Sequence, residues 1–295
     1  MATTSPTNGA ASDPPKAAAV PTAYKIIRVP RASSRLADLV TKVRATRLCA
    51  LKTDPTAFLA QHAVEEALPM DAWHARLTNP QVTVLACVAA VSPPTPGSET
   101  VAAAAEEEQG EAEYADLDSA LGSETDVNLL LEGEWLAVAA LRGPMAYEDY
   151  YVTPDMGLPV PEHPEAEARW HVYDLYTVPS QRGQGLARSL VEACISTAVG
   201  FSKALKQEHT VACGRAEDAV RKVRVRLFMN PKFAWLVRMY ESVGFAVAGK
   251  ITLIEGFRAN YMDESIPAGT DETPEGRAKW HTRFGLAMER VVDLA

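Results

Sequence analysis

The sequence of 295 residues lacks the features of several large classes of protein. It has only four cysteines, and no two of them form a C-x-x-C pair. None of its six histidines follows an H-x-x-x-H or H-E-x-x-H spacing. A disulfide framework, a zinc site and a histidine-based metal centre are therefore not expected, and we predict no metal. The cysteines are expected to pack as small apolar side chains in a reducing compartment. They are Cys49, Cys87, Cys194 and Cys213.

Long apolar runs and a basic surface are also missing. No run of eighteen apolar residues occurs, which predicts a protein without a membrane span. Residues 1–22 have no apolar core and no arginine, so we expect a disordered tail and a cytoplasmic protein, with the nucleus also compatible. Lysine and arginine are absent between Arg76 and Arg142, whereas about twelve acidic residues lie between Glu99 and Glu134. Outside that stretch 29 basic residues face 26 acidic ones, so the net charge of −9 is local and no nucleic-acid-binding face is expected.

The apolar pattern along the rest of the chain predicts one α/β domain with a mixed sheet. Residues 23–295 are expected to form this domain, with a disordered acidic insertion at about 91–132 and an irregular loop at about 144–168. Helices are expected at about 36–53, from about 71, from 186 and at 232–243. Strands are expected at 24–29, 82–90, 134–143, 169–178, 223–229, 245–254 and 283–292.

A glycine-rich stretch, VPSQRGQGLARSL at 178–190, connects a predicted strand to a predicted helix. Backbone N–H groups at the start of a helix attract phosphate, and glycines let a ligand approach them closely. The stretch is not a P-loop, because no Lys-Ser or Lys-Thr follows Gly185. It is not a dinucleotide fingerprint either, because Arg188 stands where the third glycine is required. A phosphate cradle and a plain tight turn both stay open on this motif alone.

A second motif, MYESVGF at 239–245, accompanies the first one. The stretch DLYTVPSQRGQGLA matches the Q/R-x-x-G-x-G/A signature of the GCN5-related N-acetyltransferases, and MYESVGF is similar to the Y-E-x-x-G-F of that family. The sequence therefore resembles this family over about residues 24–292, apart from the acidic insertion and the irregular stretch after it. The resemblance implies a mixed, mostly antiparallel sheet of six or seven strands flanked by helices. It also implies transfer of an acetyl group from acetyl-CoA to a primary amine.

The resemblance assigns a set of residues to acetyl-CoA. The backbone of Leu175, Tyr176 and Thr177 is expected to pair with the pantetheine arm as an added strand would. The backbone N–H groups of the loop are expected to hold the pyrophosphate, with charge added by the arginine side chains. The loop residues are Arg182, Gly183, Gln184, Gly185, Leu186, Ala187 and Arg188.

Three residues are candidates for catalysis. Tyr240 falls where the family places the tyrosine that protonates the departing thiolate. For the base that removes the amine proton, His171 stands at the position of the glutamate in the histone-modifying branch, and Asp174 matches the acid of the polyamine-acetylating branch. The two face opposite sides of a regular strand, so only one is expected to line the cleft unless a bulge intervenes. We favour Asp174, with a structural role open for either residue.

The sequence departs from the family at one point, because Phe233 replaces the asparagine that often stands seven residues before the helix tyrosine. Asn230 is expected to cap the helix instead. Contacts to the acceptor are expected from residues 52–72, 144–168 and 255–282. Within the second range, AYEDYY at 146–151 either offers acidic and aromatic groups to a cationic amine or is a solvated loop.

Two alternatives to acetyl transfer remain. One is a catalytically silent acyl-CoA-binding module with a regulatory or interaction role. The other is an acyltransferase for a longer acyl chain. The sequence identifies neither the amine acceptor nor the oligomeric state.

Overall fold

The computed structural model describes residues 23–90, 122–150, 163–213, 220–260, 262 and 266–294. The predicted tail and most of the predicted acidic insertion lie outside the described residues. Within the described part of the chain, no helix is both long enough and apolar enough to cross a membrane.

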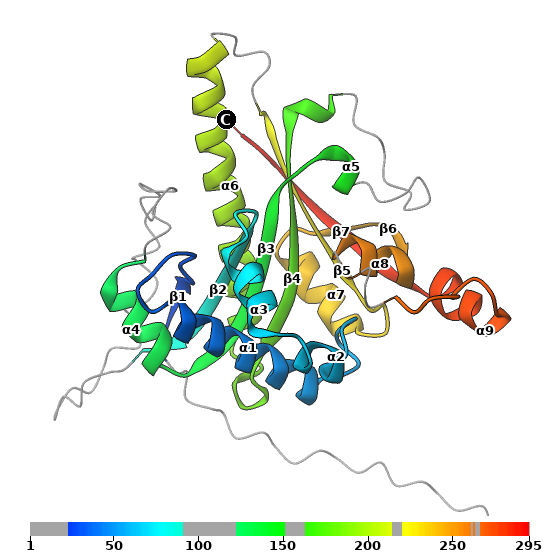
Figure 1. Ribbon diagram of the computed structural model, residues 1–295. Coiled ribbons are helices and arrows are strands. Elements are labelled where there is room, and N and C mark those ends of the chain that lie inside the picture. Colours follow the sequence, from blue (N-terminus) through cyan, green and yellow to red (C-terminus); the bar gives the residue numbers. More distant parts are fainter. Residues whose placement is uncertain are drawn as a thin grey trace, which may run out of the picture.

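Seven strands form one sheet in the order β1-β2-β3-β4-β5-β7-β6 (Figure 1). Every predicted strand is present, which confirms the mixed and mostly antiparallel sheet. Only β4 and β5 are parallel among the described strands, because the long helix α6 connects them across one face. The strands are β1 (Tyr24–Arg28), β2 (Val82–Ala89), β3 (Trp135–Met145), β4 (Glu167–Thr177), β5 (Lys222–Met229), β6 (Ala246–Thr252) and β7 (Phe284–Asp293).

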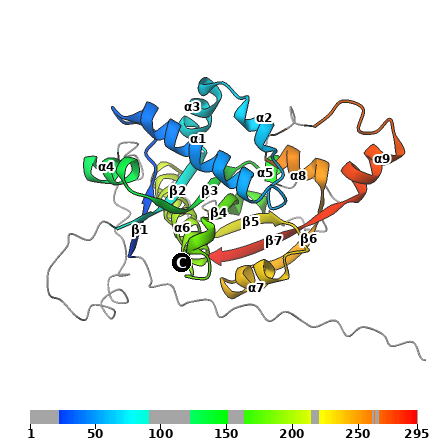
Figure 2. The ribbon, with the colours of Figure 1, turned by 90° about the horizontal axis from the view of Figure 1, so that it is seen from below.

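Helices cover both faces of the sheet (Figure 2). On one face α6 packs with α7 against an apolar cluster that contains Trp170 and Val172 of β4. On the other face α1, α3 and α4 pack against alternate residues of β2, with Trp73 and Leu130 fully or nearly fully buried. The helices used below are α1 (Leu36–Thr53), α2 (His62–Glu66), α3 (Met70–Thr78), α4 (Glu124–Glu132), α5 (Tyr147–Tyr150), α6 (Leu186–Cys213), α7 (Ala234–Ser242) and α8 (Leu253–Ala259).

Three short helices differ from the sequence-based expectations. Residues 124–132 are the ordered helix α4, not the end of a disordered insertion. Ser123 caps this helix by accepting a hydrogen bond from the Asp126 N–H, and Leu130 anchors it in the core. The predicted loop at 144–168 contains α5, and its end belongs to β4. The predicted strand at 245–254 stops at Thr252, which forms a capping box with Glu255 and starts α8.

Candidate active site

The centre of the sheet opens between β4 and β5. The two strands pair from Glu167 with Lys222 to Val172 with Leu227, and the pairing ends there. Beyond this point β4 continues to Thr177, paired on its other side with β3. In Figure 1 the two strands run together at the top of the view and diverge below. The end of β4 therefore presents an edge inside the sheet to which an extended ligand can add as a strand.

A bulge in β4 lies at this opening. Tyr173 pairs with Ala140 and Tyr176 with Val138, so two residues of β4 face one residue of β3. Asp174 takes the left-handed conformation there, with φ of 55°. A bulge inserts one extra residue and shifts the alternation of side chains. The regular-strand expectation, which put His171 and Asp174 on opposite faces, therefore does not hold.

Contacts of the side chains show this shift directly. Upstream of the bulge, His171 and Tyr173 stack in parallel at 5.8 Å on one face, and Trp170 contacts Ser202 of α6 on the other. Downstream, Asp174 meets α1, whereas Leu175 packs against the cluster beneath α6 and α7. Both candidate bases thus lie on the face covered by α1 and α8.

Asp174 remains partly accessible at the opening. About 35% of its side chain is exposed, and its Oδ1 lies 2.9 Å from a terminal nitrogen of Arg47. Desolvation raises the pKa of Asp174, Arg47 opposes this effect, and nearby Glu65 adds to it. Asp174 therefore holds a proton more tightly than an ordinary aspartate, which suits a group that takes a proton from an amine.

His171 is placed differently, since only 1% of it is exposed. Asn260 donates through Nδ2 to the Gly256 carbonyl, so its Oδ1 faces His171 Nε2 at 3.2 Å and accepts the proton of that nitrogen. Burial and the neighbouring charge of Arg226 lower the pKa of His171 well below its usual value. His171 is therefore neutral at pH 7, and its proton is held inside the protein.

The glycine loop stands at the N-terminus of α6, close in sequence to the opening. Gly183 and Gly185 have φ of 83° and 82°, a conformation that glycine adopts without strain. A Cβ built on Gly185 would meet nothing within 4 Å, so the backbone there is open to a ligand. The first N–H groups of α6 have no acceptor within the helix. These features favour the phosphate cradle over the plain turn.

The two loop arginines are already paired. Arg182 forms an ion pair with Asp54 after α1, and its Nε donates to the Thr177 carbonyl at 3.1 Å. Arg188 pairs with Glu192 one turn along α6 at 3.0 Å. We expected these side chains to add positive charge to the loop, but in the structure each guanidinium is balanced by a carboxylate. Backbone N–H groups and the start of α6 remain as the attraction for an anion.

Tyr240 lies near the end of α7, in the apolar cluster that also includes Leu175. It is 5% exposed, and its ring meets Phe245 edge-on at 5.9 Å. Burial, and secondarily Cys194, raises the pKa of Tyr240, so its hydroxyl keeps its proton at neutral pH. Asn230 does not cap α7; its side chain accepts the Lys232 N–H one turn earlier, and Phe233 is the N-cap residue.

Two of the three expected acceptor segments come together beside α2 and α8. They line a small pocket of about 40 Å³ with a carboxylate and a guanidinium in an otherwise largely apolar wall. The lining residues are Ala60, Gln61, Val64, Glu65, Leu68, Arg76, Phe257 and Met262.

The AYEDYY stretch serves the protein interior instead. Tyr150 is fully buried and donates a hydrogen bond to Glu289 at 2.7 Å. Arg226 lies 4.4 Å from the centre of its ring, and Arg169 lies 5.3 Å from that of Tyr147. These two rings therefore face the protein's own arginines and not a cationic substrate. Tyr151 lies outside the described residues.

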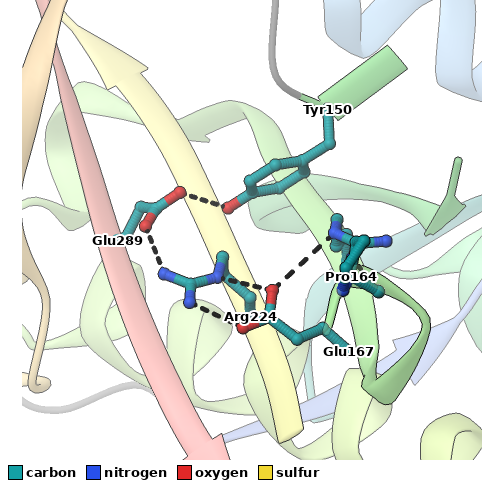
Figure 3. A network of polar contacts seen from close by, with 6 residues as sticks. Tyr150, Pro164, Glu167, Arg224 and Glu289 are labelled. Atoms are coloured by element: carbon teal, nitrogen blue, oxygen red, sulfur yellow. Dashed lines mark hydrogen bonds and ion pairs between the residues drawn. The ribbon is translucent and has the colours of Figure 1, made fainter. Parts of the chain in front are cut away.

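The buried end of this stretch belongs to a polar network across β4, β5 and β7 (Figure 3). Arg224 donates to Glu289 at 2.8 Å and to both oxygens of Glu167, at 2.7 and 3.0 Å. Tyr150 donates a hydrogen bond to the second oxygen of Glu289. Desolvation together with this carboxylate raises the pKa of Tyr150. The network joins α5 to the strands on the paired side of the opening.

Several residues of the site carry no signal in the sequence. Arg47, Glu65 and Asn260 each meet a candidate base or its partner, but they are separated from it by long stretches of chain. Neither motif includes them, and a charged residue on an amphipathic helix is normally expected in solvent. Their positions follow only from the packing of α1, α2 and α8 on the sheet.

The family comparison fits this geometry. Residues 103–217, which include β3, β4, the glycine loop and α6, match the family described as Acetyltransferase (GNAT) family. Over this segment the chain is similar to GNAT acetyltransferases. No curated protein matches the sequence. The family match includes both candidate bases and the whole cradle, whereas Tyr240 lies beyond it.

Solved structures with GNAT-family names cover nearly the whole chain at low identity. A GNAT-family acetyltransferase from Streptococcus pneumoniae is 9% identical, with 91% of this chain and 99% of that chain covered and a TM-score of 0.42. A GCN5-related N-acetyltransferase from Kribbella flavida is 11% identical, with 90% of this chain and 98% of that chain covered and a TM-score of 0.38. Arabidopsis thaliana NAA60 in complex with acetyl-CoA is 10% identical, covers 92% and 99%, and has a TM-score of 0.39. Because these TM-scores are below 0.5, the likeness to the family rests on the match of residues 103–217.

Proposed function

We propose that the protein is an acetyl-CoA-dependent N-acetyltransferase that moves an acetyl group to a primary amine of a small molecule or a protein. The observation that carries this proposal is the opening between β4 and β5, which lies beside a glycine cradle in the segment that matches the GNAT family. When bound, acetyl-CoA supplies a thioester carbon that an amine attacks directly, and the sulfur leaves.

The residues at the opening fit this co-substrate. The free side of β4 from Leu175 to Thr177 offers backbone groups to the amide-containing pantetheine arm. The open space at Gly185 and the N–H groups from Gly183 to Arg188 suit the pyrophosphate. The Val178 N–H donates to the Leu136 carbonyl of β3, so by the alternation of an antiparallel pair Tyr176 faces Val138 and the backbone groups of Leu175 and Thr177 face the opening. The Thr177 carbonyl already accepts Arg182, which leaves the Leu175 backbone and the Thr177 N–H as the better placed partners for the arm.

Asp174 and Tyr240 divide the proton transfers between them. Asp174 takes the proton that the amine loses, because it is accessible and its pKa is raised. Tyr240 supplies a proton to the departing sulfur, because its buried hydroxyl is protonated. The two residues come from opposite sides of the sheet, so a common reacting atom has to lie at the opening between them. His171 supports the floor of the site through Asn260.

The acceptor reaches this point from the side of α2 and α8, where the small pocket lies. Its mixed wall suits an amine with an apolar body. We favour this class over a highly cationic amine, because the buried Tyr150 of α5 and the pocket carboxylate Glu65 are already engaged by arginines.

A thiol-release assay tests the proposal. Purified protein is mixed with acetyl-CoA and a panel of amines: a polyamine, an aminoglycoside, a peptide with a free N-terminus, a peptide with an internal lysine and small apolar amines. We expect release of free CoA that depends on at least one amine, and a matching acetylated product by mass spectrometry. Longer acyl-CoAs in the same assay report acyl-chain preference.

Calorimetric titration with CoA distinguishes the alternative. Tight CoA binding with no thiol release across the panel supports a silent acyl-CoA-binding module and overturns the catalytic proposal. Absence of CoA binding overturns both functions.

A further inference from the structure

We propose that Arg47 is a positioning residue for Asp174, and that Glu65 holds Arg47 in the orientation that this requires. The inference rests on the proposed function, in which Asp174 is the general base. It adds two residues from α1 and α2 to the machinery of that reaction.

Arg47 is shared between two carboxylates. Its Nε and one terminal nitrogen each lie 3.2 Å from an oxygen of Glu65, and its other terminal nitrogen lies 2.9 Å from Asp174. The guanidinium also stacks on Phe58, with 4.7 Å from its carbon to the ring centre. Such two-pronged pairing fixes the plane of an arginine as a lysine cannot. Asp174 is thereby held at the opening.

Burial makes this arrangement more than a surface ion pair. Only 11% of the Arg47 side chain and 5% of the Glu65 side chain are exposed. Arg76 of α3 also reaches Glu65, at 3.3 Å, and is itself 42% exposed. Charges of alternating sign thus run from the opening to the pocket: Asp174, Arg47, Glu65, Arg76. Poor solvation keeps interactions along such a chain strong.

Glu65 also explains how the base can change its charge. When Asp174 takes a proton from the amine, Arg47 loses one of its two partners. Its charge remains compensated by Glu65, so the side chain has no reason to turn away and the carboxyl group can release the proton again. A buried arginine with Asp174 alone would hold that carboxylate ionised and make it a weaker base.

The charged and titratable groups that face Asp174 predict opposite effects of two substitutions. Arg47 from α1 and Arg76 from α3 lower the pKa of Asp174, whereas Glu65 from α2 raises it, and Tyr173 is its neighbour on β4. Removal of Arg47 is therefore expected to raise the pKa of Asp174, and removal of the Glu65 charge is expected to lower it.

The direct test is a ¹³C NMR titration of the Asp174 carboxyl group in the unliganded protein, assigned with Asp174→Asn. We expect its midpoint to rise by about one pH unit in Arg47→Gln and to fall by about half a unit in Glu65→Gln. Arg44→Gln is the matched control, because Arg44 is also half-buried on α1 and ties it to the Glu66 carbonyl of α2. This control is expected to leave the midpoint unchanged.

Kinetics give the second readout. The acid limb of kcat/KM is expected to move in the same two opposite directions, with KM for acetyl-CoA within about twofold of the original protein. In Arg47→Lys, which keeps the charge but loses the fork, kcat is expected to fall while the limb moves less than in Arg47→Gln.

Shifts of the same sign in both variants, or no shift in either, would overturn the positioning role. Should Arg47→Gln fail to fold, Glu65→Gln still decides, since an unchanged or raised midpoint contradicts the proposal. If no amine supports thiol release, the proposed function fails. The NMR titration does not depend on activity, so it still tests whether Arg47 is coupled to Asp174.

Discussion

At the scale of single residues, the two candidate bases differ in access to solvent and in charge. Asp174 stands at the opening with a third of its side chain exposed, whereas His171 is buried, neutral and bonded to Asn260. A general base has to meet the amine proton, either directly or through one water molecule. This difference assigns distinct outcomes to substitutions at the two positions.

The first prediction concerns Asp174→Asn and His171→Gln. Asparagine tolerates the left-handed conformation at the bulge, so the variant keeps the backbone and loses only the base. We expect kcat to fall about 100-fold or more in Asp174→Asn and the acid limb of kcat/KM to disappear. Activity in the original protein is lost as the pH falls through the raised pKa of Asp174, because the base is then protonated.

His171→Gln is expected to retain that acid limb, with circular dichroism as the check that both variants are folded. The reverse pattern of activity would transfer the role of base to His171.

The second prediction concerns Tyr240→Phe. The ring stays in its apolar cluster, so the fold and the affinity for CoA are expected to remain. Loss of the hydroxyl removes the proton donor, and turnover should fall at least about tenfold in steady-state kinetics. Unchanged turnover would leave Tyr240 with a packing role only.

At the scale of elements, the glycine loop and α6 form one unit. In the third prediction, Gly185→Ala adds a methyl group into open space, so it clashes with no part of the protein. The methyl group occupies the approach to the backbone N–H groups, and we expect Kd for CoA to rise about tenfold or more by calorimetry.

Gly269→Ala is the matched control for the loop. Gly269 also has a positive φ, of 74°, so alanine introduces comparable backbone strain there, and its Cβ would meet only the flexible end of the Glu272 side chain, at 2.9 Å. It lies outside the cradle, and Kd for CoA is expected to stay unchanged. Equal weakening in both variants would mean that strain, and not occupation of the cradle, is responsible.

The fourth prediction concerns α5 and the network of Figure 3. Tyr150→Phe removes the hydrogen bond to the buried carboxylate of Glu289. A bond to a charged group contributes about 1.5–3 kcal/mol, so chemical denaturation should show a loss of free energy of unfolding of this order. CoA affinity should not change, because the network lies on the paired side of the opening. A loss of CoA affinity at unchanged stability would contradict this assignment.

The elements with repeated local patterns could be predicted from the sequence. β4, the glycine loop and α6 follow from an aromatic and β-branched run, two glycines and an apolar stripe, and the family resemblance assigned the glycine loop to the pyrophosphate. The bulge could not be predicted, because Asp174 fits a regular strand by its sequence neighbours. Nor could the partners of Asp174, since Arg47 and Glu65 reach it only through packing of separate helices on the sheet.

At the scale of the whole molecule, one sheet connects two apolar clusters. The cluster beneath α6 and α7 includes Trp170, and the cluster beneath α1 and α3 includes Trp73. Both rely on the same strands, so neither half is expected to be stable without the other. We therefore keep the single domain from residue 23 to 295 as a prediction.

The fifth prediction is therefore a single cooperative unfolding transition. We expect the calorimetric and van't Hoff enthalpies of unfolding to agree, and the buried amides of β2 and β4 to exchange at similar free energies. Two separate transitions would show that the two faces of the sheet unfold independently.

The bulge at Asp174 shifts the alternation of side chains in β4 by one residue. Every side chain after it lies on the opposite face of the sheet from the one that its number would give in a regular strand. Deletion of Leu175 would remove the bulge and make the strand regular. Tyr176 would still pair with Val138 and stay on the α1 side, whereas Asp174 would turn to the face covered by α6, away from Arg47. The side of the sheet on which Asp174 lies therefore depends on the number of residues in β4 as much as on their identity.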